Sequence, residues 1–97
     1  MPLFAVFRKR GPGWKTSLPL EGQQNWDTHA SFMDALAADG FALLVGPLED
    51  TGEALIIVRA NSAREVEERL AGDPWTKTGL LLTMRIAEWT LRIGQLN

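Results

Sequence analysis

Hydrophobic residues occur in short runs that predict β-strands, separated by longer stretches with helical periodicity. Three of the runs are apolar at consecutive positions and do not alternate with polar residues. This pattern is typical of strands that are covered on both faces. Together with a fourth, partly alternating segment, they predict strands at residues 3–7, 41–45, 54–58 and 80–89.

Residues 25–40 carry the spacing of an amphipathic helix. Apolar side chains recur three or four residues apart, at Trp26, Ala30, Met33 and Ala37. This spacing places them in one stripe that faces a core. Asn25 or Asp27 is expected to cap the start of the helix, and Gly40 to end it in a left-handed conformation.

A second helix is predicted to begin at Ser62. Glu65 follows Ser62 at the spacing of a capping box, and Gly72 marks the end of the helix. Asp73 is followed directly by Pro74, which predicts a single helical turn over residues 73–79 with Asp73 as its cap.

The predicted element order is β-α-β-β-α-β, which is the ferredoxin-like pattern of an α+β protein. It implies one domain over residues 1–97, with a four-stranded antiparallel sheet and two helices on one face. Because the strands are apolar on both faces, the uncovered face would be a large apolar patch. We therefore expect a homodimer packed sheet against sheet. The alternative is that the C-terminal tail folds back over that face. Separately, residues 90–97 are expected to form a short tail that extends the last strand through Leu91 and Ile93.

Chain reversal in this topology brings four distant segments to one end of the sheet. They are the loop 8–22, the start of the first helix with His29, the strand end Gly46-Pro47, and residues 73–75. The loop is rich in glycine and proline and longer than most connections, so we expect it to lie over this end as a lid.

His29 and Asp73 form the sharpest candidate for chemistry. A carboxylate that accepts a hydrogen bond from one imidazole nitrogen fixes the tautomer and makes the other nitrogen a better base. The structural alternative is equally concrete, since Asp73 is explained as a helix cap and His29 as a histidine at the edge of a core. Asp34 is expected to point away from His29, and Glu53 to be solvated in the turn between two strands.

Other residues at this end could shape a ligand site. Trp26 and Trp75 could form its walls or could be ordinary core residues. The backbone at Gly46-Pro47 would form its floor. Arg8 begins a basic run that could attract an anionic ligand, although a solvated loop explains the run as well.

Composition excludes several classes of function. The chain has 97 residues, no cysteine, one histidine and a formal net charge of −2. No thiol chemistry or disulfide is available, no metal site or cofactor is expected, and the charge argues against nucleic-acid binding. Neither a signal peptide nor a membrane-spanning run is recognisable, so we expect a cytoplasmic protein that does not bind membranes.

The sequence resembles the YciI-like (YCII-related) family of small bacterial proteins, within the dimeric α+β barrel superfamily. The resemblance extends over nearly the whole chain and depends on three marks. They are His29 early in the first helix, the strand end 43–47 with its Gly46-Pro47, and Asp73-Pro74-Trp75 followed by residues 78–80. In one respect the chain departs from the family pattern, because Trp26 stands where an arginine is often found three residues before the histidine.

The resemblance implies a homodimer with a His-Asp active site, here His29 and Asp73. One family member has been linked to dehydrochlorination of a hydroxylated aromatic compound, and relatives in the superfamily isomerise lactones. We therefore expect a small enzyme without a cofactor that performs elimination or isomerisation on a small, cyclic or aromatic organic anion. The alternative is a ligand-binding or regulatory dimer without catalysis, and a weaker one is a nucleic-acid-associated module.

Overall fold

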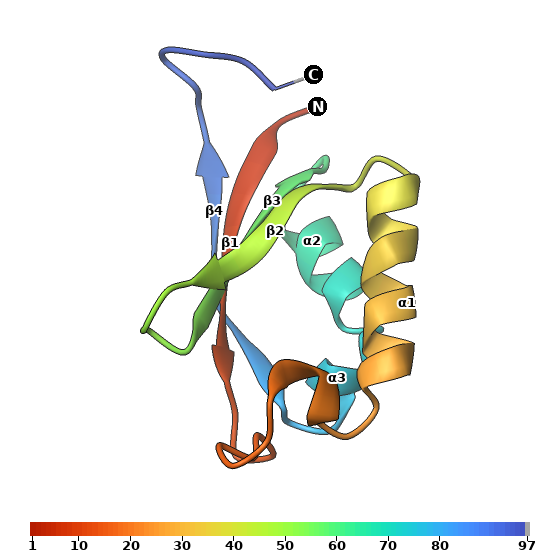
Figure 1. Ribbon diagram of the computed structural model, residues 1–97. Coiled ribbons are helices and arrows are strands. Elements are labelled where there is room, and N and C mark those ends of the chain that lie inside the picture. Colours follow the sequence, from red (N-terminus) through yellow and green to blue (C-terminus); the bar gives the residue numbers. More distant parts are fainter. Residues whose placement is uncertain (97) are drawn as a thin grey trace.

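The computed structural model describes residues 1–96 and contains four strands, three α-helices and one 3-10 turn (Figure 1). In chain order the elements are β1 (Leu3–Arg10), η1 (Leu20–Gly22), α1 (Trp26–Ala38), β2 (Ala42–Leu48), β3 (Glu53–Arg59), α2 (Ala63–Leu70), α3 (Pro74–Lys77) and β4 (Leu81–Trp89).

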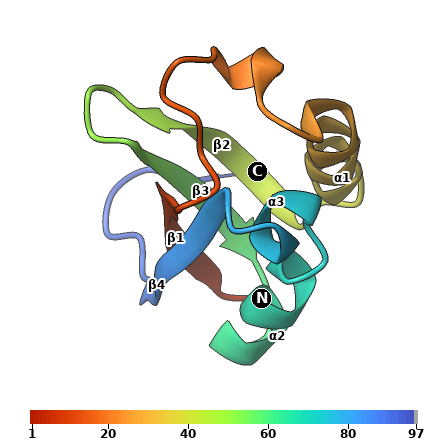
Figure 2. The same ribbon diagram turned by 90° about the horizontal axis from the view of Figure 1, so that it is seen from below.

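The four strands form one antiparallel sheet in the order β2-β3-β1-β4, and the helices all lie on one of its faces (Figure 1). This order and the element sequence confirm the predicted ferredoxin-like α+β fold. The start of α1, the short α3 and the chain between β1 and α1 lie together at the lower end of the sheet in Figure 1. Figure 2 shows that chain segment crossing from β1 to α1.

The core lies between the sheet and the two longer helices. Alternate residues of β1 and β3 point toward the helices, and α2 contributes its apolar stripe. The buried cluster includes Phe4, Val6, Ile56, Val58, Val66 and Leu70. The fold thereby fixes the positions of β1, α1 and α3, the three elements from which the site is built.

Strands β1 and β2 are longer than the sequence pattern indicated. β1 continues to Arg10. Arg8 and Lys9 pair with both β3 and β4, and Arg10 pairs with β4 alone. The prediction that Arg8 begins a loop was therefore wrong. β2 likewise continues through Gly46-Pro47 to Leu48, and Pro47 opposes Ala54 at the edge of the sheet.

Three of the predicted helix ends show the expected capping geometry. Ser62 accepts a hydrogen bond from the amide of Glu65 at 3.1 Å, and Asp73 accepts one from the amide of Trp75 at 2.9 Å. Gly40 has a φ of +86°, as expected for a helix-ending glycine. The prediction that Asn25 or Asp27 caps α1 was wrong, because Asn25 occupies the N-cap position with a φ of +63° and makes no side-chain cap, and Asp27 lies inside the helix.

An irregularity in pairing changes the faces of β4. The register between β1 and β4 shifts between Phe7 and Arg8, which moves later side chains to the opposite face. The sequence pattern placed Leu80, Leu82, Met84 and Ile86 on one face. Instead Leu80 is buried and Ile86 packs on the core, whereas Met84 is 56% exposed. Residues 90–96 contain no strand, so the predicted strand extension of the tail was also wrong.

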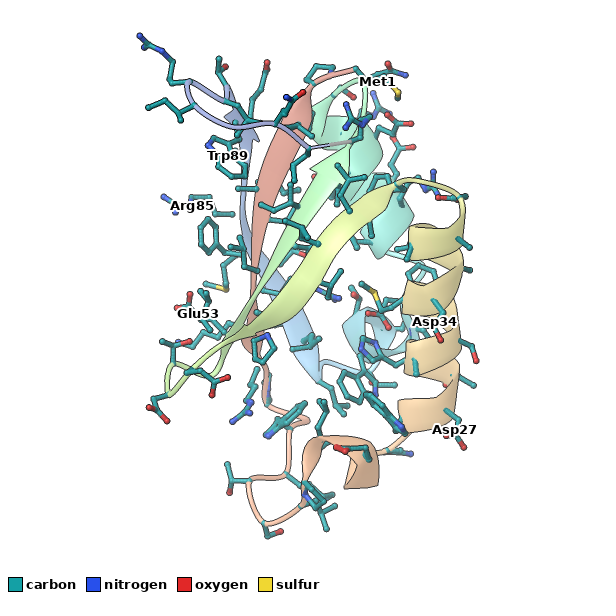
Figure 3. The ribbon with its side chains drawn as sticks, turned by 45° about the horizontal axis from the view of Figure 1, so that its top comes forward. Met1, Asp27, Asp34, Glu53, Arg85 and Trp89 are labelled. Carbon is teal, nitrogen blue, oxygen red and sulfur yellow. The ribbon has the colours of Figure 1, made fainter. Side chains whose placement is uncertain are left out.

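The sheet face opposite the helices exposes apolar side chains. Leu44, Leu82 and Trp89 are all at least 40% exposed, and Arg85 lies on the ring of Phe7 on the same face. Figure 3 shows Arg85 and Trp89 on the side away from α1. Within residues 1–96, no helix is both long enough and apolar enough to cross a membrane.

Candidate active site

A cavity of about 460 Å³ lies between α1 and the lower part of the sheet. Its walls come from β1, the loop after it, α1, the β2-β3 hairpin, α3 and the start of β4. Six of the seven residues that the sequence singled out line it: Arg8, Trp26, His29, Gly46, Pro47 and Trp75. The seventh, Asp73, lies behind His29 and is fully buried.

The side chains of His29 and Asp73 are in direct contact. The Nδ1 atom of His29 lies 2.9 Å from Oδ1 and 3.0 Å from Oδ2 of Asp73. An ionised carboxylate can only accept hydrogen bonds, so the imidazole donates from Nδ1 and Nε2 carries the lone pair. Within residues 1–96, Nε2 has no hydrogen-bond partner and is not closed off from solvent. The arrangement therefore leaves a basic nitrogen available at the cavity.

Asp73 holds its charge inside the protein because it is surrounded by donors. Besides His29, it accepts from the Nη1 of Arg8 at 2.8 Å and from the amide of Trp75 at 2.9 Å. Burial by itself raises the pKa of the Asp73 carboxyl. The hydrogen bonds from His29, Arg8 and the Trp75 amide outweigh this effect and hold the pKa below its ordinary value of 3.8. The carboxylate is therefore ionised at neutral pH.

Trp75 fixes the plane of the His29 ring. The two rings are stacked, with centroids 3.8 Å apart and planes inclined by 4°. Trp75 is itself held by a hydrogen bond of 2.7 Å from its Nε1 to the carbonyl of Gln24, and its side chain is buried. The stack therefore holds the imidazole in one orientation beside the cavity.

Arg8 is the third charged member of this buried group and is only 1% exposed. It belongs to β1, on the same side of the strand as Phe4 and Val6. Its Nη2 donates to Thr76 Oγ1, and that hydroxyl donates to the carbonyl of Leu70 at 3.1 Å. Both terminal nitrogens are thus engaged by the protein, so contact of Arg8 with an anionic ligand stays a prediction.

The loop between β1 and α1 forms one wall of the cavity. Gln23 is buried and fastens the loop by bonding to the amide and carbonyl of Lys15, at 3.0 and 2.7 Å, and to the carbonyl of Leu18 at 3.0 Å. Trp14, on the same loop, packs edge-on against Trp75 at 5.5 Å and lies under the guanidinium of Arg10. The loop therefore supplies an ordered aromatic wall at the place where a lid was expected.

Two acidic residues line the cavity although the sequence analysis set them aside. Asp34 lies one helical turn after Ala30 and borders the cavity beside it, and Glu53 borders it from the first position of β3. Figure 3 shows Asp34 on α1, whereas the side chain of Glu53 lies on the side of the sheet away from α1, so Glu53 borders the cavity only at the end of β3. Within residues 1–96 Asp34 makes no hydrogen bond to His29, in line with its expected direction, but the cavity extends along α1 past His29 and reaches Asp34. The four-residue spacing from Ala30 was the signal that could have identified it.

Few residues near the cavity are suited to bind a metal ion. Within residues 1–96 there is no group of three histidine, cysteine, aspartate or glutamate side chains placed to share one ion. Most of the lining is apolar or aromatic, and its ionisable side chains include Arg8, Arg10, His29 and Asp34. The geometry is thus suited to proton transfer with a small, planar organic molecule.

Comparisons with known proteins agree with this description. A search of curated proteins finds no match. Among solved structures, the chain is similar to 5-chloro-2-hydroxyhydroquinone dehydrochlorinase (TftG) from Burkholderia phenoliruptrix AC1100, in complex with 2,5-dihydroxybenzoquinone. The sequence identity is 28%, the TM-score is 0.67, and the alignment covers 91% of this chain and 93% of that one. The family model of the YCII-related domain matches residues 3–90. The chain therefore belongs to the YCII-related family, as its sequence motifs indicated.

Proposed function

We propose that this protein is a small enzyme that uses His29 and Asp73 for acid–base chemistry on a small aromatic or cyclic organic anion. The observation that carries the proposal is the contact of His29 Nδ1 with Asp73 beside a cavity onto which Nε2 opens. The dehydrochlorinase with which the chain aligns over 91% of its length supports an aromatic substrate. The identity of that substrate is a separate question.

The proposed reaction is an elimination or an isomerisation in which His29 moves the proton. In an elimination, Nε2 takes a proton from the substrate, and the electron pair of the broken bond forms a new double bond. The leaving group departs with the electrons of its own bond to carbon. Asp73 stabilises the imidazolium, which returns its proton to solvent or, in an isomerisation, to another substrate carbon.

The cavity suits a substrate of this class. Its volume is at the small end of the range for ligand sites. Two half-buried tryptophans, Trp14 and Trp26, contribute ring surface on which an aromatic ligand can pack, and the buried Trp75 supports them from behind. Arg10 supplies a cation at its edge. These features support the substrate class without specifying its substituents.

The test is a set of chlorinated and unchlorinated polyhydroxybenzenes, including 5-chloro-2-hydroxyhydroquinone, followed by chloride release and by absorbance of the quinone product. We expect turnover by the wild type and a decrease of about 10²- to 10⁴-fold in His29→Gln. Binding of 2,5-dihydroxybenzoquinone, followed by tryptophan fluorescence, should persist in that variant. Wild-type binding without turnover of any member would instead favour the ligand-binding alternative.

We also propose that the protein is a cytoplasmic homodimer formed through the open face of the sheet. The exposed apolar side chains on that face support it, because monomers rarely leave such a patch uncovered. Leu44→Glu should yield a monomer near 10.7 kDa in light scattering. Leu18→Glu, at a similarly exposed leucine in the loop, should leave the dimer intact. A wild type of monomer mass at micromolar concentration would refute the dimer.

A further inference from the structure

The side chain of Arg8 is buried at the back of the cavity, in contact with Asp73 and with no acidic residue besides it. Its Nη1 lies 2.8 Å from Asp73 Oδ2, and its Nη2 is held by Thr76. Its Nε is buried without a partner within residues 1–96. Burial of a guanidinium costs desolvation free energy, and one ion pair offsets only part of that cost. Packing alone does not account for its presence, since an apolar residue would fill the position at lower cost.

The net charge of the buried group formed by Arg8, His29 and Asp73 depends on Arg8. With Arg8 positive and Asp73 negative, the group is neutral when His29 is neutral. Without Arg8, a neutral His29 would leave the Asp73 charge uncompensated in the interior, and the group would be neutral only with His29 protonated. The structure therefore places, beside the carboxylate, the charge that allows the imidazole to give up its proton.

The remaining charged groups around His29 are less closely coupled to it. Arg10 on β1, Asp34 on α1 and Glu53 on β3 line the cavity, but Arg10 and Asp34 are exposed and Glu53 is half-buried. None of the three forms an ion pair within residues 1–96, and solvent screens their effect on the ring. Asp73 is thus the charged group in direct contact with His29, and Arg8 is the one in direct contact with Asp73.

We propose that Arg8 is a positioning residue that acts through Asp73 to keep His29 neutral, with its proton on Nδ1 and its Nε2 free to accept one. The inference rests on the proposed function only for its catalytic consequence. A base must be unprotonated before it can act, so Arg8 widens the pH range in which His29 is ready. The hydrogen bond from Arg8 Nη2 to Thr76 and the one from Thr76 to Leu70 hold the guanidinium in this position.

The test is an NMR titration of the His29 ring in Arg8→Met without substrate. Because His29 is the only histidine, its ring signals need no assignment by mutation. We expect the titration midpoint to rise by at least about one pH unit relative to wild type, a tenfold change in proton affinity. Arg10→Met is the matched control, since it removes the same charge two residues further along β1. Its midpoint should move by only a few tenths of a unit.

Two further variants cover the case in which Arg8→Met does not fold. Arg8→Lys keeps the charge and should return the midpoint toward wild type. Thr76→Val removes the acceptor of Arg8 Nη2 and should raise the midpoint by a smaller amount. An unchanged midpoint in folded Arg8→Met, or in Thr76→Val where the former does not fold, would overturn the proposal. Equal shifts in Arg8→Met and Arg10→Met would do the same.

The same variants separate this inference from the proposed function. If substrate turnover is found, the acidic limb of the pH–rate profile should move upward in Arg8→Met by the amount seen in the titration. If no substrate is turned over but the midpoint still rises, the role of Arg8 stands and the proposed enzyme activity does not.

Discussion

Asp73→Asn should destabilise the protein far more than its small change in shape suggests. The substitution keeps the volume but removes the negative charge that compensates Arg8 and replaces one acceptor oxygen with an amide donor. Asp73 is fully buried and accepts from His29, Arg8 and the amide of Trp75, so all three donors lose part of their partner. Breaking a buried ion pair from one side costs about 3–5 kcal/mol.

That cost is a large fraction of the stability of a domain of this size, which is about 5–15 kcal/mol. We expect the melting temperature to fall by roughly 12 °C or more, since about 1 kcal/mol corresponds to 4–8 °C in a domain of this length. Urea unfolding followed by circular dichroism gives the free energy directly. Asp39→Asn is the matched control, because Asp39 also pairs with an arginine, Arg69, but at the surface. Its midpoint should be nearly that of wild type.

The difference in unfolding free energy between wild type and Asp73→Asn should depend on pH in a defined direction. The pKa of Asp73 is lowered in the folded state, so its contribution to stability is complete above the unfolded value, near 3.8, and is lost as the pH falls through the folded value. The gap between wild type and Asp73→Asn should therefore narrow below about pH 4. Equal stabilities of Asp73→Asn and Asp39→Asn at neutral pH would refute the reasoning. So would a His29 titration that is the same in Asp73→Asn and wild type.

Three further predictions concern the walls of the cavity. Asp34→Asn should strengthen binding of 2,5-dihydroxybenzoquinone, an acidic ligand, several-fold at low salt. Asp27→Asn, which lies outside the cavity on the same helix, should leave the binding unchanged. Fluorescence titration at two salt concentrations measures both effects. Gln23→Ala should speed amide exchange in residues 15–18 about tenfold by releasing the loop. Gln24→Ala, whose side chain makes no hydrogen bond within residues 1–96, should leave exchange unchanged. Trp75→Phe should cost about 1 kcal/mol in urea unfolding, because it removes the hydrogen bond to the Gln24 carbonyl.

The fold could be predicted because each helix and strand is marked by residues within its own segment of the sequence. Apolar runs located the strands, and the caps at Ser62 and Asp73 located two helix starts. Once the element order was known, chain direction alone brought the segments of His29 and Asp73 to the same end of the sheet. That the two side chains are in hydrogen-bonding contact needed the structure, because the twist of the sheet and the rotation of α1 decide it.

The errors have physical causes of two kinds. The face assignment of β4 was wrong because one irregular pairing inverts every later position, and nothing in the sequence marks it. Arg8 was assigned to a loop because a run of three basic residues is usually solvated. The available signal was the alternation Phe4, Val6, Arg8, in which every second residue of β1 is buried. Following it would have placed a charged side chain in the interior. The basic character of the run indicated a loop instead.

The buried charges are the feature that the fold itself does not require. Apolar residues of the same volume at Arg8, His29 and Asp73 would pack between β1, α1 and α3 without any desolvation cost, and such replacements often leave a protein as stable or more stable. A chain of 97 residues has little stability to spare. Asp73 instead binds both Arg8 and His29, and the group leaves a basic nitrogen of His29 beside an aromatic-walled cavity. A local departure from the apolar pattern that places paired charges beside a cavity is typical of a site kept for its chemistry.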